Sequence, residues 1–163
     1  MPDNQMARML RHLDKVPALL RTRARSLLIG RMVHFVGTAG LQIEELTHTR
    51  AVVSIRNRKP VQNHIGTVHA AAMALIAETA SGFVVGMNVP DDRVPVIKSM
   101  HIDFVKRSRG HMRAVAELTD EQIASIVATE KGEVTPRLVV TDDDHKEPIV
   151  CEMVWAWTPK RRA

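Results

Sequence analysis

Tyrosine is missing from this sequence, and aromatic residues make up only 3% of it. Proteins that bind single-stranded nucleic acid stack bases on aromatic side chains, and the zinc-finger spacing and RNA-binding strand motif are missing too. We therefore expect no nucleic-acid partner. Hydrophobic residues still make up 45% of the chain, so the core is expected to consist of Val, Ile, Leu, Met and Ala.

The single cysteine, Cys151, excludes an internal disulfide and fits a reducing, cytoplasmic location. It lies in the apolar run IVCEMVWAW, where packing in a buried strand is its expected role. No stretch reaches the ~18 uninterrupted apolar residues of a membrane span. The first residues, MPDNQMARMLRHLDK, contain acids and do not resemble a secretory signal. We expect no membrane partner.

The length of 163 residues fits one domain, residues 1–163. The net charge of +5 suggests an anionic partner. Nucleic acid, membrane headgroups and a phosphate-bearing small molecule all have this chemistry, and composition alone does not choose among them.

Apolar residues at three- and four-residue steps from Met6 to Leu20 predict an amphipathic helix, with Pro17 as a kink or break. We expect an N-terminal helical segment over residues 1–30. The runs LQIEELTHT and RAVVSIRNR then predict a β-hairpin that turns around His48 to Arg50.

The second half of the chain is predicted to be mainly strands. The run VPVIKSMHIDFVKRS alternates, with one set of side chains on one face: Val96, Lys98, Met100, Ile102 and Phe104. HMRAVAELT, EVTPRLVVT and IVCEMVWAWTP predict further strands, and a Thr119 to Gln122 capping box predicts a short helix between them. Hairpin-linked strands form a mainly antiparallel sheet, which indicates an α+β fold.

The stretch NHIGTVHAAAMALIAETASG, Asn63 to Gly82, contains the long apolar helix expected to cover this sheet. We predict a central helix over residues 67–86, with Thr67 as its N-cap and Gly82 or Gly86 as a left-handed stop. Burying the carboxylate of Glu78 in this helix costs several kcal/mol unless it is paired or does chemistry. The alternative is a half-exposed residue that is solvated or salt-bridged.

The start of this helix and Glu78 are too far apart to act together within one chain. The N–H groups at a helix start can hold an oxyanion. Ala70 and Glu78 are separated by about 12 Å along the axis, because a helix rises 1.5 Å per residue. A single site therefore needs two antiparallel copies of the helix, as a homodimer provides.

The pattern Asn63-His64-x-Gly66-Thr67-x-His69-Ala70, with an acid eight residues later, resembles the motif of hotdog-fold acyl-CoA thioesterases. The resemblance is to the phenylacetate-pathway branch and its DUF4442-like relatives, and it runs from about Leu41 to Trp157. It implies a hotdog fold: a curved, mainly antiparallel sheet around one long helix, with an extra N-terminal helix here. It also implies side-by-side dimers, alone or paired into tetramers.

The resemblance implies hydrolysis of an acyl-CoA thioester to free acid and coenzyme A, with no cofactor beyond the substrate's coenzyme A. Glu78 then acts as general base or as nucleophile through a mixed anhydride. Asn63 holds the thioester or orients water, and the Ala70 N–H polarises the carbonyl, although relatives usually have glycine there. His69 shapes the turn and the thioester pocket, and the alternative is a direct role in proton transfer.

The resemblance also implies substrate contacts from Gly66, Thr67 and a hydroxyl on the strand after the helix, for which Ser99 is the nearest candidate. A cluster of basic residues in FVKRSRGHMR is either solvated hairpin charge or a site for the phosphates of coenzyme A; its members are Lys106, Arg107, Arg109 and Arg113. The histidines do not have the spacing of a zinc site, so we expect no metal.

Two other functions remain open, and a third does not fit the sequence. A hotdog hydratase pairs an acid and a histidine five residues apart near the helix start, and nothing here matches. A non-catalytic acyl-CoA-binding or regulatory module is consistent with Ala70 in the usual glycine position. A basic nucleic-acid-binding protein would show steeply salt-dependent binding.

Overall fold

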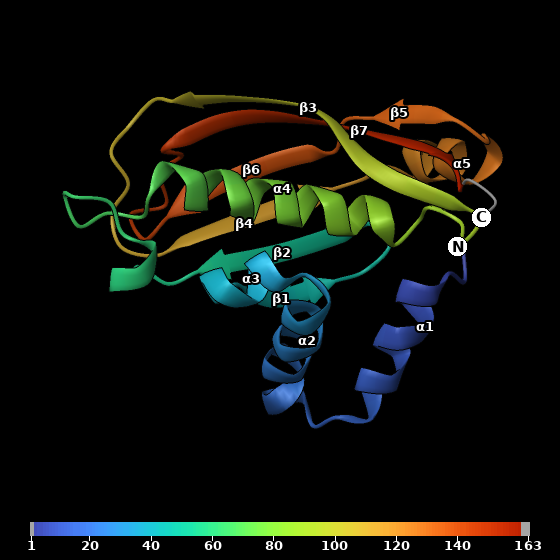
Figure 1. Ribbon diagram of the computed structural model, residues 1–163, viewed down its shortest axis with the longest axis horizontal. Helices are drawn as coiled ribbons and strands as arrows, with labels where there is room; N and C mark the ends of the chain where they lie inside the picture. Colours follow the sequence, from blue (N-terminus) through green and yellow to red (C-terminus); the bar gives the residue numbers. More distant parts are fainter. Residues whose placement is uncertain (1, 161–163) are drawn as a thin grey trace.

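The computed structural model describes residues 2–160 and has a curved sheet around one central helix (Figure 1). The helical elements are α1 (Gln5–Arg11), η1 (His12–Lys15), α2 (Ala18–Met32), α3 (His34–Ala39), η2 (Lys59–Val61), α4 (Ala70–Gly86) and α5 (Asp120–Ala128). The strands are β1 (Gln42–Leu46), β2 (Arg50–Ile55), β3 (Arg93–Phe104), β4 (Met112–Glu117), β5 (Gly132–Val134), β6 (Arg137–Asp142) and β7 (Ile149–Pro159).

The strands pair antiparallel in two groups, β1-β2-β4-β6 and β3-β7-β5. Strand β6 runs beside β7, so the two groups form one curved layer with β1 at one side and β3 at the other (Figure 1). This arrangement confirms the predicted α+β class and its mainly antiparallel sheet.

Helix α4 lies against the concave face of the sheet because its inward side is apolar and mostly small. A Cβ on Gly82 would lie 2.5 Å from Cζ2 of Trp155, so only glycine permits this approach to β7. Nε1 of Trp155 donates to Oγ of Ser81 at 3.0 Å. The prediction of Gly82 or Gly86 as a left-handed stop is wrong: Gly82 lies inside the helix, which ends at Gly86 with Met87 in the right-handed region.

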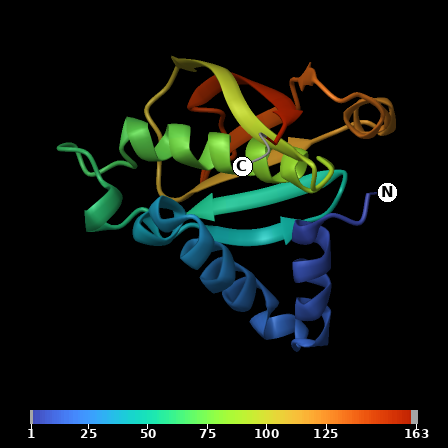
Figure 2. The same cartoon turned by 45° about the vertical axis from the view of Figure 1, so that its right-hand side comes forward.

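The N-terminal helical segment extends beyond the predicted residue 30 to Ala39. Gly30 lies inside α2, where its Cα approaches Gly37 closely. The left-handed residue that ends the segment is Gly40, with φ +67°. Pro17 precedes α2, which confirms the predicted break. In Figures 1 and 2, α1 and α2 extend as a pair beyond β1, away from the body of the sheet.

Two strand predictions need correction. A β-bulge at Lys98 interrupts the alternation of β3, because Ile97 pairs with Trp155 while Ser99 pairs with Val154. Val96 therefore does not share a face with Met100, Ile102 and Phe104, contrary to the predicted alternation. The predicted strand EVTPRLVVT is divided into β5 and β6 around Pro136, which has no N–H for a ladder. The Thr119 to Gln122 capping box of α5 is confirmed.

No helix within residues 2–160 combines the length and the apolar character needed to cross a membrane.

Candidate active site

A tight loop before α4 is organised by the side chain of Asn63. Its Oδ1 accepts hydrogen bonds from the backbone N–H groups of Ile65 and Thr67, both at 3.1 Å. Its Nδ2 donates to Oγ1 of Thr67 at 2.8 Å. Gly66 sits at the turn with φ +77°. Asn63 thus positions the chain at the entrance to the helix, and one of its two amide hydrogens is used inside the loop.

Helix α4 starts at Ala70, three residues later than predicted, and His69 rather than Thr67 is its N-cap. Val68 forms a β-bridge with Gln62 and is fully buried, which keeps the chain extended past Thr67. Nδ1 of His69 accepts from the Ala71 N–H at 3.0 Å.

The Ala70 N–H is the donor left at the helix start. As the first residue of the helix it has no intrahelical partner, and none is found for it within residues 2–160. His69, Ala70 and Ala71 are all exposed, so a ligand can reach this N–H. The helix dipole favours negative charge at the same point. The helix start can therefore hold a developing oxyanion.

Glu78 lies two turns along α4 and is half-buried. Burial raises its pKa above the usual 4.5, while a 3.4 Å hydrogen bond from the Thr79 hydroxyl acts in the opposite direction. A carboxyl with a raised pKa is a stronger base once ionised. Glu78 is thus half-buried, and it forms no salt bridge within residues 2–160. The alternative of a half-exposed but salt-bridged residue is therefore not supported.

Glu78 lies on the side of α4 that approaches β7, the strand that pairs with β3. Gly82 lies one turn further along the same helix face and packs against Trp155 of β7. On β3, Met100 and Phe104 are 52% and 55% exposed. They pair with Met153 and Ile149, whose side chains are buried beneath the helix, so all four share its side of the sheet.

Met100 and Phe104 are exposed apolar residues on the α4 side of the sheet that the sequence analysis did not single out. The predicted alternation of this strand did place Met100 and Phe104 on one face together with Ile102. The sequence alone did not show that Met100 and Phe104 remain exposed in the folded chain.

Ser99 is not brought to this region. It pairs with Val154, which lies between the inward residues Met153 and Trp155, so Ser99 points to the opposite face of the sheet from α4. The bulge at Lys98 causes this reversal. The structure offers no contact between Ser99 and the carboxyl of Glu78.

The basic cluster does meet the loop before α4. Nη2 of Arg107 donates to the carbonyl oxygen of Ile65 at 3.3 Å. A cavity of about 510 Å³ opens between the two segments, and its lining is Asn57, Ile65, Gly66, Thr67, Arg107, Ser108, Arg109 and Gly110. Lys106 is exposed beside it, whereas Arg113 lies on β4 and pairs with Glu44 at 2.9 Å.

Two further polar groups in this cavity were missed by sequence reasoning. Ser108 is only 2% exposed, and its Oγ has no hydrogen-bond partner within residues 2–160. The same holds for Oδ1 of Asn57, whose Nδ2 donates to the Gly66 carbonyl at 3.1 Å. Neither residue has a pattern in the sequence that marks it.

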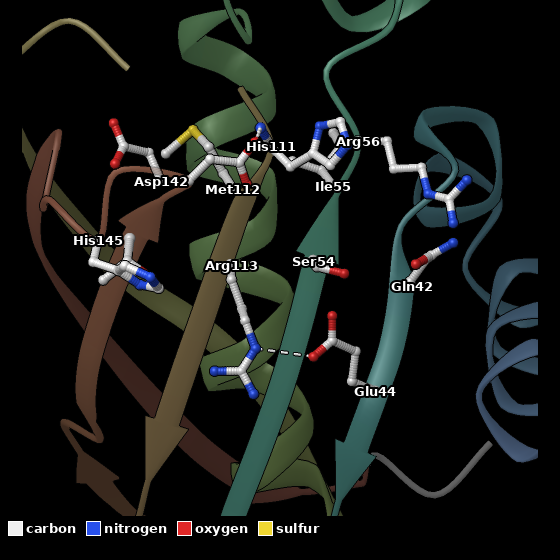
Figure 3. A pocket seen from close by; sticks show the side chains of 12 residues that line it. Gln42, Glu44, Ser54, Ile55, Arg56, His111, Met112, Arg113, Asp142 and His145 are labelled. Carbon is white, nitrogen blue, oxygen red and sulfur yellow. Dashed lines mark hydrogen bonds and ion pairs between the residues drawn. The ribbon is translucent and has the colours of Figure 1, made fainter. Parts of the chain in front are cut away.

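A separate cavity of about 570 Å³ lies on the convex face of the sheet (Figure 3). Gln42, Ser54 and Arg113 line it from three neighbouring strands, and α4 lies behind the sheet. The sheet therefore separates this cavity from Glu78. Acidic and basic residues both line this cavity, and Glu44 is paired with Arg113. The cavity therefore favours neither an anionic nor a cationic ligand.

Cys151 lies on β7 and is half-buried. Burial, and secondarily the charge of Glu147, raise the pKa of its thiol to about 11. The thiolate that a nucleophile requires is therefore scarce at neutral pH, and the thiol acts in packing. Within residues 2–160 no three His, Cys, Asp or Glu side chains are grouped as metal ligands.

The family model described as "Domain of unknown function (DUF4442)" matches residues 21–157. Among solved structures, a Pseudomonas aeruginosa protein of unknown function with the description "Probable Thioesterase" is 23% identical; the match covers 85% of this chain and 96% of that one, with a TM-score of 0.76. A thioesterase from Haemophilus influenzae is 11% identical over 78% of this chain and 85% of its own, with a TM-score of 0.64. A variant of a Staphylococcus aureus thioesterase is 17% identical; the match covers 77% of this chain and 99% of that one, with a TM-score of 0.65.

A search among curated proteins gives no match. The structural likenesses show the fold, and the family model covers most of the sequence. The chain therefore belongs to the DUF4442 family and has the hotdog fold.

Proposed function

We propose that this protein hydrolyses an acyl-CoA thioester at a site shared by two subunits. The observation that carries the proposal is the half-buried carboxyl of Glu78, with its raised pKa, on the side of α4 that approaches β7. The exposed start of the same helix lies about 12 Å away along the axis, so the two groups complement each other only across a pair of helices. The thioesterase descriptions of the similar structures support this chemistry.

The dimer is proposed to form along β3. This strand pairs with β7 on one side, and no strand in residues 2–160 pairs with its other edge. Its exposed apolar residues are Val94, Val96, Met100 and Phe104. An exposed apolar edge strand is a template for pairing with another chain. A second copy here brings two α4 helices side by side, antiparallel about the two-fold axis.

In the proposed mechanism, the Ala70 N–H of one subunit holds the thioester carbonyl oxygen. Glu78 of the other subunit either removes a proton from water that attacks the carbonyl carbon, or attacks it directly to give a mixed anhydride that water then cleaves. Both routes consume one water and release the acid and the thiol of coenzyme A. Asn63 and His69 are positioning residues, because they fix the loop and the helix start.

Subunit complementation tests the shared site. Glu78→Gln and Ala70→Pro subunits, each inactive alone, are mixed after mild unfolding and refolded together. Half of the dimers then contain one subunit of each kind, and one of their two sites has both groups intact, so about a quarter of parental activity returns. If each site lay within one chain, mixing would restore no activity, and that result would exclude the shared site. Refolded parent protein is the control for recovery.

We also propose that the cavity between the loop before α4 and Arg107 to Gly110 binds the phosphates of coenzyme A. Arg107 and Arg109 supply cations, and the unpartnered hydroxyl of Ser108 can donate a hydrogen bond to a phosphate oxygen. Removing a charged hydrogen bond to phosphate costs about 1.5–3 kcal/mol.

Arg107→Ala with Arg109→Ala is therefore expected to raise KM for a CoA ester at least about tenfold and to leave kcat similar. A pantetheine ester has no nucleotide phosphates, so its KM is expected to be unchanged. The matched control is Arg137→Ala, an exposed arginine on β6 outside this cavity. Equal effects on both esters would show that the cluster is surface charge.

The second candidate function is a non-catalytic acyl-CoA-binding module. Ala70 in the usual glycine position favours it, because the methyl group narrows the approach to the N–H donor. Tight binding without turnover over short, long and aryl acyl-CoA esters would select this function.

A further inference from the structure

The positive charge of the protein is concentrated in its N-terminal helices. The segment from residue 15 to residue 43 has five basic residues, Lys15, Arg21, Arg23, Arg25 and Arg31, and no acidic one. It therefore accounts for the whole net charge of +5. The two acids that follow on β1 are paired elsewhere: Glu44 with Arg113, and Glu45 with Arg50. Of the arginines on α2, Arg23 and Arg31 are exposed.

The same segment exposes large apolar side chains. Leu19, Leu27 and Phe35 are 94%, 57% and 61% exposed, and Leu20, Met32 and Val33 are exposed as well. On α2, the outward residues Leu20, Arg23, Leu27 and Arg31 follow one another at three- and four-residue steps, so they form one stripe. We call the surface formed by this stripe together with Leu19, Met32, Val33 and Phe35 the basic-apolar surface.

The basic-apolar surface lies far from the proposed dimer contact. Helix α2 packs on β1, whereas β3 is at the other side of the curved sheet (Figure 1). In Figure 2, α1 and α2 meet at the end of the pair that lies farthest from the sheet. Dimerisation along β3 therefore leaves this surface open.

A second copy of the chain is a poor partner for this surface. A two-fold contact would place Arg23 and Arg31 against the same arginines, with no acid in the segment to pair with them. Exposed leucines interleaved with arginines suit a different partner. Amphipathic helices that lie in a bilayer interface bury leucine and phenylalanine among the acyl chains while their cations contact anionic headgroups.

We propose that the basic-apolar surface binds anionic lipid bilayers, with α2 lying in the interface and without crossing it. The proposal revises the expectation of no membrane partner, which was based on the missing membrane span. It is independent of thioester hydrolysis, because the surface contains none of the residues proposed to act in catalysis. It gives the exposed cations of this surface, Arg23 and Arg31, a partner of opposite sign.

Co-sedimentation with vesicles tests the proposal. The parent protein is expected to bind vesicles containing roughly 30% phosphatidylserine and to bind phosphatidylcholine vesicles far less. Arg23→Glu with Arg31→Glu is expected to lower the partition coefficient by at least about 25-fold, since each cation near the surface contributes about fivefold. Leu20→Ser with Leu27→Ser is expected to lower the partition coefficient by at least about tenfold.

Salt provides a further test of the charge contribution. Raising salt from about 0.1 to about 1 M is expected to weaken binding, because the Debye length falls from about 10 to about 3 Å.

The matched control is Val127→Ser with Lys131→Glu, which changes an exposed apolar residue and an exposed cation at α5 and the turn after it. It is expected to bind vesicles like the parent, and thermal melting checks that every variant is folded. Failure of the parent to bind anionic vesicles would overturn the proposal. Binding of the leucine variant and the arginine variant to these vesicles as strongly as the parent would also overturn it. A third contrary result is a parent protein that forms tetramers, with Leu20→Ser plus Leu27→Ser abolishing them.

Discussion

Replacing Glu78 with glutamine is expected to lower kcat for a CoA thioester by about 100- to 10,000-fold. Glutamine has the size of glutamate and can still hydrogen-bond, but it neither takes a proton from water nor attacks a carbonyl carbon. KM is expected to change little, since the carboxyl acts on the reacting centre. The measurement is release of free thiol from a substrate that the parent turns over. Unchanged release would remove Glu78 from the mechanism.

The same variant is expected to be more stable than the parent at neutral pH. Burial raises the pKa of Glu78 above 4.5, so the folded chain holds this proton more tightly than the unfolded chain. The associated stability is present below the unfolded pKa and is lost as pH rises through the folded pKa. The gain in Tm of Glu78→Gln is therefore expected to be small near about pH 4 and larger toward neutrality. Glu130→Gln, at an exposed turn, is the control.

Replacing Ala70 with proline is expected to lower kcat by about 100- to 1000-fold, the usual effect of removing one oxyanion donor. Proline fits the first position of a helix, where its missing N–H breaks no helical hydrogen bond. His69 has ψ 144°, the extended conformation that proline requires of the preceding residue. The substitution therefore removes the donor and keeps the helix.

Ala70→Gly is the matched control, because it keeps the N–H and removes only the methyl group. It is expected to retain turnover, or to increase it for bulky acyl groups. Circular dichroism and Tm show whether α4 is intact in both variants. If Ala70→Pro is folded and as active as Ala70→Gly, the helix start does not hold the carbonyl oxygen.

Local patterns in the sequence predicted most of the secondary structure. The two-residue alternation after Pro90 predicted β3, and the Thr119 to Gln122 pattern predicted the start of α5. The small, apolar run around Glu78 predicted the central helix and the one acid in it that needs an explanation. These features depend on residues within a few positions of one another, so the sequence contains all of the information for them.

Contacts between distant residues decided the details of the site. The start of α4 moved to Ala70 because Val68 is buried and bridged to Gln62. Gly82 lies within the helix because Trp155 occupies the space of its side chain. No local pattern contains either contact.

The sequence by itself determined the fold class, the central helix and the unusual acid Glu78, because hydrophobic period and capping are short-range properties. The tertiary structure alone decided which face each residue occupies. The bulge in β3 turned Ser99 away from α4, and the packing of α2 on β1 left Leu20, Arg23, Leu27 and Arg31 exposed together. Both outcomes depend on how strands and helices far apart in the chain pack, and a one-residue shift in a strand is enough to reverse a face.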